Sequence, residues 1–134
     1  MSANKTILVV EQDAAEAEKI LNFFRENGFK NKIEMMKNKR EALNYIFNNE
    51  TPGLILLDLL TNKTPDIRVL KPLQSYLRTE NIPIVILTSS AEQEKEVREY
   101  GFGVMSFIRK PLDFTRFIEV IQSMGIHLKE KDTH

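Results

Sequence analysis

At residues 54–58 the chain reads Leu54-Ile55-Leu56-Leu57-Asp58, an unbroken apolar run that ends in a carboxylate. Similar apolar runs occupy residues 6–10, 82–87 and 104–108, and a weaker one occupies residues 32–36. Short runs that are apolar throughout, without alternation, are typical of strands that are buried on both faces of a parallel sheet. The sequence therefore predicts five parallel strands.

Segments with helical periodicity lie between these runs. The clearest has apolar residues at positions i, i+3, i+4 and i+7, namely Phe114, Phe117, Ile118 and Ile121. Further helices are expected at residues 17–24 and 42–47, around Pro72, and at residues 92–100. Strands that alternate with helices predict right-handed crossovers, with helices on both faces of the sheet. The fold class is therefore α/β, with five strands and five helices. Gly28 is expected to follow the end of the first helix, and Asn38 to cap the start of the second.

The composition sets limits on the class of protein. A chain of 134 residues, 42% hydrophobic and 28% charged, fits a single domain, with a core over about 6–124 and a frayed tail over 125–134. The 19 basic and 19 acidic residues cancel, so no net charge favours nucleic acid or a membrane as a partner. The absence of cysteine excludes disulfides, and no long apolar segment indicates a membrane span. A cytoplasmic location is expected.

Polar side chains follow four of the predicted strands, at Glu11 and Asp13, Asp58, Thr88 and Lys110. In an open parallel sheet the carboxyl ends of the strands share one edge, where ligands bind. Two carboxylates about 5 Å apart repel by roughly 3 kcal/mol at an effective dielectric constant near 20, so Glu11 and Asp58 need a cation or a lysine between them. Magnesium suits a site with few protein ligands. Lys110 and Thr88 could then hold the oxygens of a phosphoryl group attached to Asp58.

Each of these residues also has an ordinary structural interpretation. An Asp after a strand is often a turn or cap residue, and Thr88-Ser89-Ser90 could cap the fourth helix. Lys110 before Pro111 could be a turn lysine, although the residue before a proline favours an extended conformation that would project it from the strand end. The combination, one suitable residue at the end of each of four strands, favours a site.

On these residues the sequence resembles the receiver domain of two-component response regulators, over about residues 6–124. The segments that carry the resemblance are Ile7-Leu8-Val9-Val10-Glu11, Leu54-Ile55-Leu56-Leu57-Asp58, Ile82-Pro83-Ile84-Val85-Ile86-Leu87-Thr88 and Phe107-Ile108-Arg109-Lys110-Pro111. The resemblance implies a flavodoxin-like, doubly wound (βα)5 fold with strand order 2-1-3-4-5. The approach Asn81-Ile82-Pro83 is most similar to single-domain regulators that are paired with bacterial phytochrome kinases.

The resemblance also implies roles for individual residues. Asp58 is similar to the residue that accepts a phosphoryl group from a histidine kinase or a phosphotransfer protein, and Lys110 to the lysine that pairs with the phosphate. Magnesium ligands would be Glu11, Asp58 and the backbone carbonyl of Leu60. The Lys110-Pro111 peptide bond is expected to be cis. The domain would be a signalling module, with at most self-catalysed phosphoryl transfer and dephosphorylation as its chemistry.

Thr88 and Phe107 resemble the pair of residues that rotates on activation of a receiver domain. They would couple the site to a surface formed by the fourth helix, the fifth strand and the fifth helix, which could bind a downstream protein or a second copy of the chain. Phe107 has no hydroxyl to hydrogen-bond in either state. We therefore expect packing alone to register its position.

Two departures from the family pattern leave an alternative open. Gln12 stands where the family usually has a second acidic residue that ligates magnesium, and an amide offers an oxygen without the charge. The loop at 59–66 lacks the usual proline and glycine turn residues. A pseudo-receiver that acts as a phosphorylation-independent binding or dimerisation module is therefore the main alternative.

Enzymatic alternatives have less support in the sequence. A flavodoxin-like cofactor enzyme needs glycines or hydroxyls in the loop after the first strand, and residues 11–16 are acidic there instead. A hydrolase would need a histidine near the strand ends, whereas His127 and His134 lie near the tail. Their position also argues against a zinc site.

Overall fold

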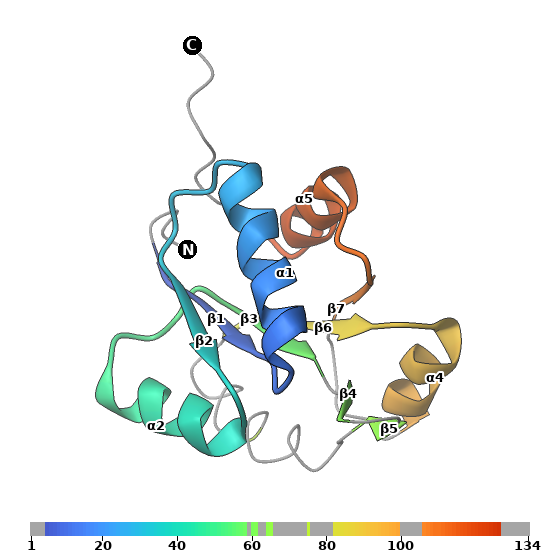
Figure 1. Cartoon of the computed structure of the whole chain (residues 1–134), viewed down its shortest axis with the longest axis horizontal. Coiled ribbons are helices and arrows are strands. Elements are labelled where there is room, and N and C mark those ends of the chain that lie inside the picture. The colour runs from blue at the N-terminus through green and yellow to red at the C-terminus, as the bar shows by residue number, and fades with distance from the viewer. Residues whose placement is uncertain are drawn as a thin grey trace.

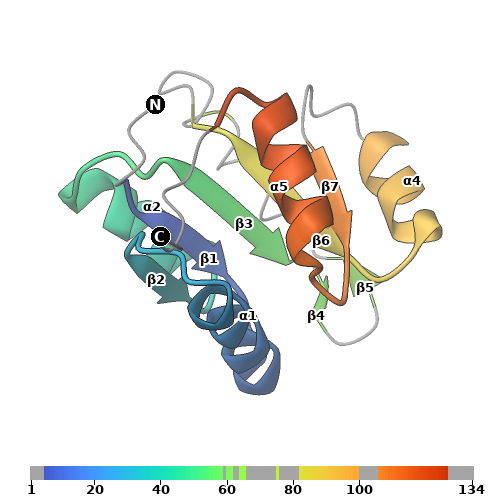
Figure 2. The same cartoon turned by 90° about the horizontal axis from the view of Figure 1, so that it is seen from above.

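A computed structural model describes residues 5–58, 60–61, 64–65, 75, 82–99 and 106–126. Its main sheet consists of β1 (Ile7–Val10), β2 (Ile33–Met36), β3 (Leu54–Asp58), β6 (Ile84–Thr88) and β7 (Ser106–Arg109). The strand order is β2-β1-β3-β6-β7, and every pair is parallel (Figure 2). Counted along the chain as the first to fifth long strands, this is the predicted order 2-1-3-4-5, so the predicted fold is confirmed.

Four helices of the described part flank the sheet: α1 (Ala14–Glu26), α2 (Lys39–Asn48), α4 (Ala91–Glu99) and α5 (Phe114–Ser123). Figure 1 shows α1 and α5 on one face of the sheet and α2 and α4 on the other. The helix expected around Pro72 lies outside the described residues, as do most of the tail and Tyr100. None of the helices that the structure describes is long and apolar enough to cross a membrane.

The segment after β3 differs from the expectation of a plain loop. It contains a short antiparallel pair, β4 (Leu60–Thr61) with β5 (Thr64–Pro65), which is separate from the main sheet. Thr61 pairs with Thr64, which leaves a two-residue connection, the commonest length for a hairpin. This antiparallel pair therefore forms in a segment that lacks the usual proline and glycine.

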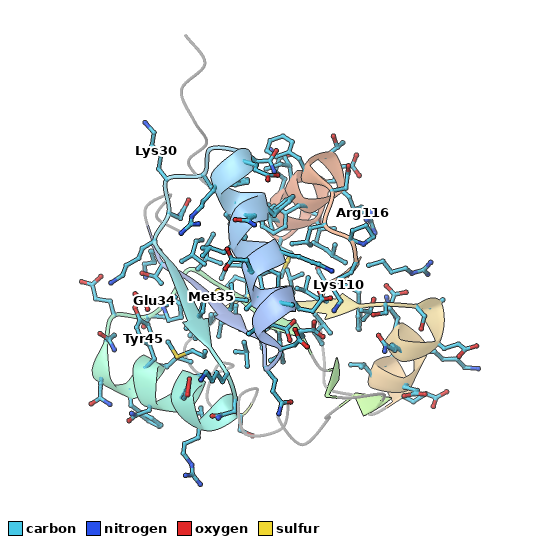
Figure 3. The ribbon with its side chains drawn as sticks, in the orientation of Figure 1. Lys30, Glu34, Met35, Tyr45, Lys110 and Arg116 are labelled. Carbon is cyan, nitrogen blue, oxygen red and sulfur yellow. The ribbon has the colours of Figure 1, made fainter. Side chains whose placement is uncertain are left out.

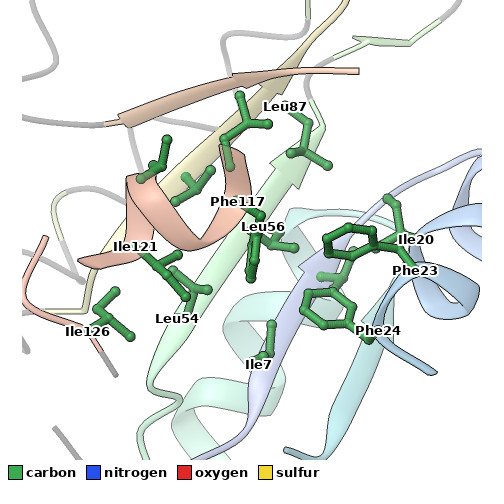
Figure 4. Packing of buried hydrophobic residues seen from close by; sticks show 14 residues of the cluster. Ile7, Ile20, Phe23, Phe24, Leu54, Leu56, Leu87, Phe117, Ile121 and Ile126 are labelled. Carbon is green, nitrogen blue, oxygen red and sulfur yellow. The ribbon is translucent and has the colours of Figure 1, made fainter. Parts of the chain in front are cut away.

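Alternate residues of each strand point to opposite faces of the sheet and build two cores. Leu54 and Leu56 face α1 and α5, whereas Ile55 and Leu57 face α2 and α4. The core under α1 and α5 holds a cluster of phenylalanines with mostly edge-to-face contacts, formed by Phe23, Phe24, Phe29, Phe114 and Phe117. Figure 4 shows Phe23, Phe24 and Phe117 packed above the strands. By the same alternation, Asp58 lies on the α1 and α5 side of the sheet.

Side-chain caps fix where the helices begin. Asn38 accepts a hydrogen bond from the backbone N–H of Glu41, so the predicted cap of α2 is confirmed. Asp13 caps α1 in the same way and Asp113 caps α5. Gly28 follows the end of α1, as predicted. Its φ is 70°, a conformation that glycine adopts without strain.

Replacing the cap of α5 tests this local account. Asp113→Ala removes the acceptor for the Arg116 N–H, so we expect the free energy of unfolding to fall by about 1 kcal/mol. Urea denaturation measures the change, with the exposed Gln122→Ala in the same helix as the control. Equal midpoints for the two variants would contradict the capping role.

Candidate functional site

The site is centred on an ion pair between Asp58 and Lys110. Asp58 is the last residue of β3, and its side chain is 1% exposed. The Lys110 Nζ lies 2.6 Å from its Oδ2 and donates a hydrogen bond to it. Lys110 is held in place by its backbone N–H, which donates to the Thr88 carbonyl at 2.7 Å, and its peptide bond to Pro111 is cis, as predicted. Figure 3 shows Lys110 beside the first turns of α1.

Glu11 is the second buried carboxylate, directly after β1, and it is 4% exposed. Its Oε2 accepts a hydrogen bond from the Asp13 N–H at 3.1 Å, while its buried Oε1 has no donor among the described residues. Burial raises the pKa of Glu11 to about 8, helped by a hydrogen bond with Asp58 and by the charge of that carboxylate. The Asp13 N–H and the Lys110 charge act in the opposite direction. The two carboxylates therefore lie close together, as predicted.

Lys110 compensates this pair in part. Burial lowers its pKa, but the hydrogen bond and charge of Asp58, with the charges of Glu16 and Glu11, outweigh burial and raise the pKa above the usual value. One ammonium therefore serves several carboxylates. A divalent cation would neutralise the remaining negative charge, because the Glu11 and Asp58 carboxylates are hard oxygen ligands.

The acidic residues available to a cation are few. No group of three or more acidic, histidine or cysteine side chains that could hold a metal occurs in the described part of the chain. Gln12 is exposed, and Asp13 does not replace it, because its Oδ1 accepts from the Glu16 N–H at 3.0 Å to cap α1. The donor set is thus a pair of carboxylates, which fits magnesium with several waters better than calcium. Leu60 begins β4 two residues after Asp58, and the role of its carbonyl stays a prediction.

Thr88 and Phe107 lie on the other face of the sheet, the one covered by α2 and α4. Thr88 ends β6 and is 2% exposed, and its Oγ1 has no hydrogen-bond partner among the described residues. Phe107 is buried in the core with Val97 of α4. Strand alternation puts both side chains on this face, because Thr88 follows Ile84 and Ile86 at intervals of two.

The family model described as the response regulator receiver domain matches residues 7–122. The chain belongs to this family. It is 34% identical over 113 residues to the probable methanogenesis regulatory protein FilR2 of Methanothrix harundinacea, covering 81% of this chain and 73% of that protein. It is 32% identical over 120 residues to the phosphate regulon transcriptional regulatory protein PhoB of Escherichia coli, covering 90% of this chain and 51% of PhoB. The receiver domain thus spans about half the length of PhoB.

Solved structures show the same relationship. The bacteriophytochrome response regulator AtBRR superposes with a TM-score of 0.81 at 30% identity, covering 93% of this chain and 95% of its own. RtBRR, also a bacteriophytochrome response regulator, gives a TM-score of 0.78 at 31% identity, covering 93% of this chain and 80% of its own. The predicted similarity to phytochrome-associated regulators is therefore confirmed in both sequence and structure. Receiver domains are signalling modules of two-component systems that interact with histidine kinases and downstream effectors.

The receiver domain has a contact that the sequence analysis missed at Phe107. The guanidinium carbon of Arg98, in the last turn of α4, lies 4.4 Å from the centre of the Phe107 ring. A cation over an aromatic face is attracted by the ring quadrupole, so this contact holds Phe107 in addition to its packing, and the role of packing in the switch stays a prediction. The same helix is tied to β7 by Glu94 and Arg109, whose charged atoms are 3.3 Å apart.

The start of α4 decides between the two interpretations of residues 88–90. The Ser90 Oγ accepts from the Gln93 N–H at 3.3 Å, and the Gln93 side chain accepts from the Ser89 N–H at 2.7 Å. Ser89 and Ser90 therefore belong to the helix cap. Thr88 remains in the strand, and its hydroxyl is not committed to a hydrogen bond within the described structure.

Removing the Arg98 cation tests its contact with Phe107. Arg98→Gln should lower the free energy of unfolding by about 0.5–1 kcal/mol, the usual size of an exposed cation–π contact. It should also speed amide hydrogen exchange in α4, because one of its ties to β7 is lost. Lys95→Gln, an exposed residue of the same helix, is the matched control. Identical exchange in the two variants would show that Arg98 does not hold the helix.

Proposed function

We propose that Asp58 accepts a phosphoryl group from a histidine kinase or a phosphotransfer protein, and that this modification switches a protein-binding surface. The carrying observation is the 2.6 Å pair of Lys110 with a nearly buried Asp58, next to the second carboxylate of Glu11. A buried carboxylate at a strand end, with an ammonium in contact, is a positioned nucleophile with a ready partner for phosphoryl oxygens.

In the transfer, a carboxylate oxygen of Asp58 forms the new bond to phosphorus, and the donor departs with the electron pair of its own bond to phosphorus. Lys110 would then turn from Asp58 to a phosphoryl oxygen, a short movement because it already touches the nucleophile. Glu11, Asp58 and the Leu60 carbonyl would hold magnesium, with the uncharged amide oxygen of Gln12 as a further ligand. Bound magnesium would supply positive charge for the transferred oxygens.

The switch would start at Thr88. Its buried hydroxyl is not committed to a hydrogen bond within the described structure, so a phosphoryl oxygen on Asp58 offers it a partner that the resting protein does not. Movement of Thr88 would change the packing around Phe107, which shares its face of the sheet, and through Arg98 the position of α4. A shift from 1:99 to 99:1 in such an equilibrium requires about 5.5 kcal/mol of differential interaction.

The surface that would respond comprises α4, β7 and α5. It would bind a downstream protein or form a homodimer, and the balanced net charge gives no support for nucleic acid or a membrane as the partner. A single-domain organisation and a cytoplasmic location stay predictions.

Labelling with a small phosphoryl donor tests the role of Asp58. With acetyl phosphate and magnesium, we expect a base-labile phosphoryl group on the wild type and at least roughly a hundred-fold less on Asp58→Asn, which has no nucleophilic carboxylate. Asp113→Asn is the matched control, because an asparagine can still cap α5. Label that persists in Asp58→Asn would remove Asp58 from its role.

The pseudo-receiver remains the second candidate, favoured by the exposed Gln12 and by a donor set of two carboxylates in the described structure. Amide NMR spectra with magnesium and beryllofluoride separate the two functions. A phosphoryl acceptor should show shifted resonances for Thr88 and Phe107. Unmoved resonances, together with absent labelling of the wild type, would establish the inert binding module instead.

A further inference from the structure

A groove opens beside Lys110, between α1 and the segment that follows β7. Its volume is about 510 Å³, and the residues that line it come from α1, from Ser89 and from residues 110–112. Ile20 and Phe23 of α1 face Pro111 and Leu112 across it. Lys110 lines this groove and also contacts Asp58, so the groove lies beside the ion pair.

Glu16 lies at the point where the groove meets this pair. Its Oε2 is 3.7 Å from the Lys110 Nζ, and its Oε1 is 3.4 Å from the Nζ of Lys19. Its backbone is fixed, because its N–H donates to the Asp13 cap. The Glu16 side chain is 34% exposed, whereas that of Asp58 is 1% exposed. Lys110 is therefore shared between a buried carboxylate and one that faces the groove.

The position of Glu16 beside Lys110 affects how an incoming phosphoryl donor can bind. A phosphoryl group must bring its oxygens to Lys110, and Glu16 both competes for that ammonium and repels the oxygens. A positive charge next to the phosphoryl group would instead be attracted by Glu16, since its other partner, Lys19, is 74% exposed and free to move away. Charges at the rim of a site act mainly on association and on the choice of partner.

Building on the proposed function, we propose that Glu16 sets the donor preference of the site. It disfavours small anionic phosphoryl donors and favours a donor that carries positive charge beside its phosphoryl group. The step itself is unchanged. A new bond forms between phosphorus and an Asp58 oxygen, the bond between phosphorus and the leaving group breaks, and the electron pair leaves with that group, so no oxidant or reductant takes part.

Two small donors test this preference. Acetyl phosphate has an anionic leaving group, whereas phosphoramidate has a protonated nitrogen in its leaving group at neutral pH. Both are supplied with magnesium at low ionic strength, where screening is weak. Rates of phosphorylation are measured for the wild type, for Glu16→Gln and for Glu18→Gln. Glu18→Gln removes the same charge from an exposed position of α1 and serves as the control.

We expect Glu16→Gln to speed phosphorylation by acetyl phosphate roughly five-fold and to change the phosphoramidate rate less than about two-fold. Added salt should reduce the difference, and Glu18→Gln should match the wild type with both donors. Equal gains in the two variants, or a loss with both donors in a folded Glu16→Gln, would overturn the donor preference while leaving the phosphoacceptor role in place. A wild type that neither donor labels would overturn the proposed function itself, and the inference with it.

Discussion

Lys110→Met is expected to lower the free energy of unfolding by about 3 kcal/mol at pH 8. The substitution keeps much of the side-chain length but removes the ammonium that contacts the Asp58 Oδ2 at 2.6 Å. Asp58 and Glu11 then remain as buried neighbouring carboxylates without that charge, which is costly when both are ionised. At pH 5 the loss should be smaller, because Glu11, whose pKa is about 8, is then protonated and no longer interacts with Lys110 as an anion.

Urea denaturation at the two pH values measures this difference. Lys19→Met is the control, since the Lys19 side chain is 74% exposed and its ion pair with Glu16 contributes little. A loss in Lys110→Met that does not depend on pH would show that the Lys110 charge does not act on Glu11. A loss equal to that of the control would mean that the buried ion pair does not form.

The second large effect is a pH dependence that Glu11 imposes on stability. Its pKa is raised from 4.5 to about 8 in the folded protein, so between these values the folded protein holds a proton that the unfolded chain has released. The stability from this group is therefore full below about pH 4.5 and falls as the pH rises towards 8. The fall should amount to about 3–5 kcal/mol. Glu11→Gln cannot ionise and should lack it.

Denaturation curves for the wild type and for Glu11→Gln from pH 5 to pH 8.5 isolate this contribution, with Glu18→Gln as the control for the loss of one exposed carboxylate. Magnesium should stabilise the wild type more at high pH than at low pH, because it binds the ionised pair. Parallel pH profiles for the wild type and Glu11→Gln would contradict the raised pKa of Glu11.

Much of the fold could be predicted because its strands are buried on both faces. Such strands need apolar residues at every position, so the run at 54–57 and those like it stand out in the sequence. Capping residues such as Asn38 bind backbone groups that are close in sequence, so they could be predicted equally well. The β4–β5 pair was missed because strands of two residues carry no periodicity that a sequence pattern can detect.

The candidate site likewise contains residues that the sequence predicted and residues that it did not. Asp58, Glu11 and Lys110 come together because strand ends share one edge of the sheet, a consequence of topology that the sequence reveals. Glu16 and Arg98 were missed because each reaches its partner from a helix, and the rotation of a helix on the sheet is set by tertiary packing. A signal for Glu16 existed in hindsight, since it follows the cap residue Asp13 by three positions and so faces the same edge.

The two faces of the sheet differ in how firmly they hold their helices. Five phenylalanine rings in mutual contact connect α1 with α5 on one face. On the other face, the buried residue of α4 is Val97. Of the helices that the structure describes, we therefore expect α4 to move more readily than α1 or α5. A disturbance at the shared edge should therefore displace α4 first, while α1 and α5 keep a constant surface beside Lys110.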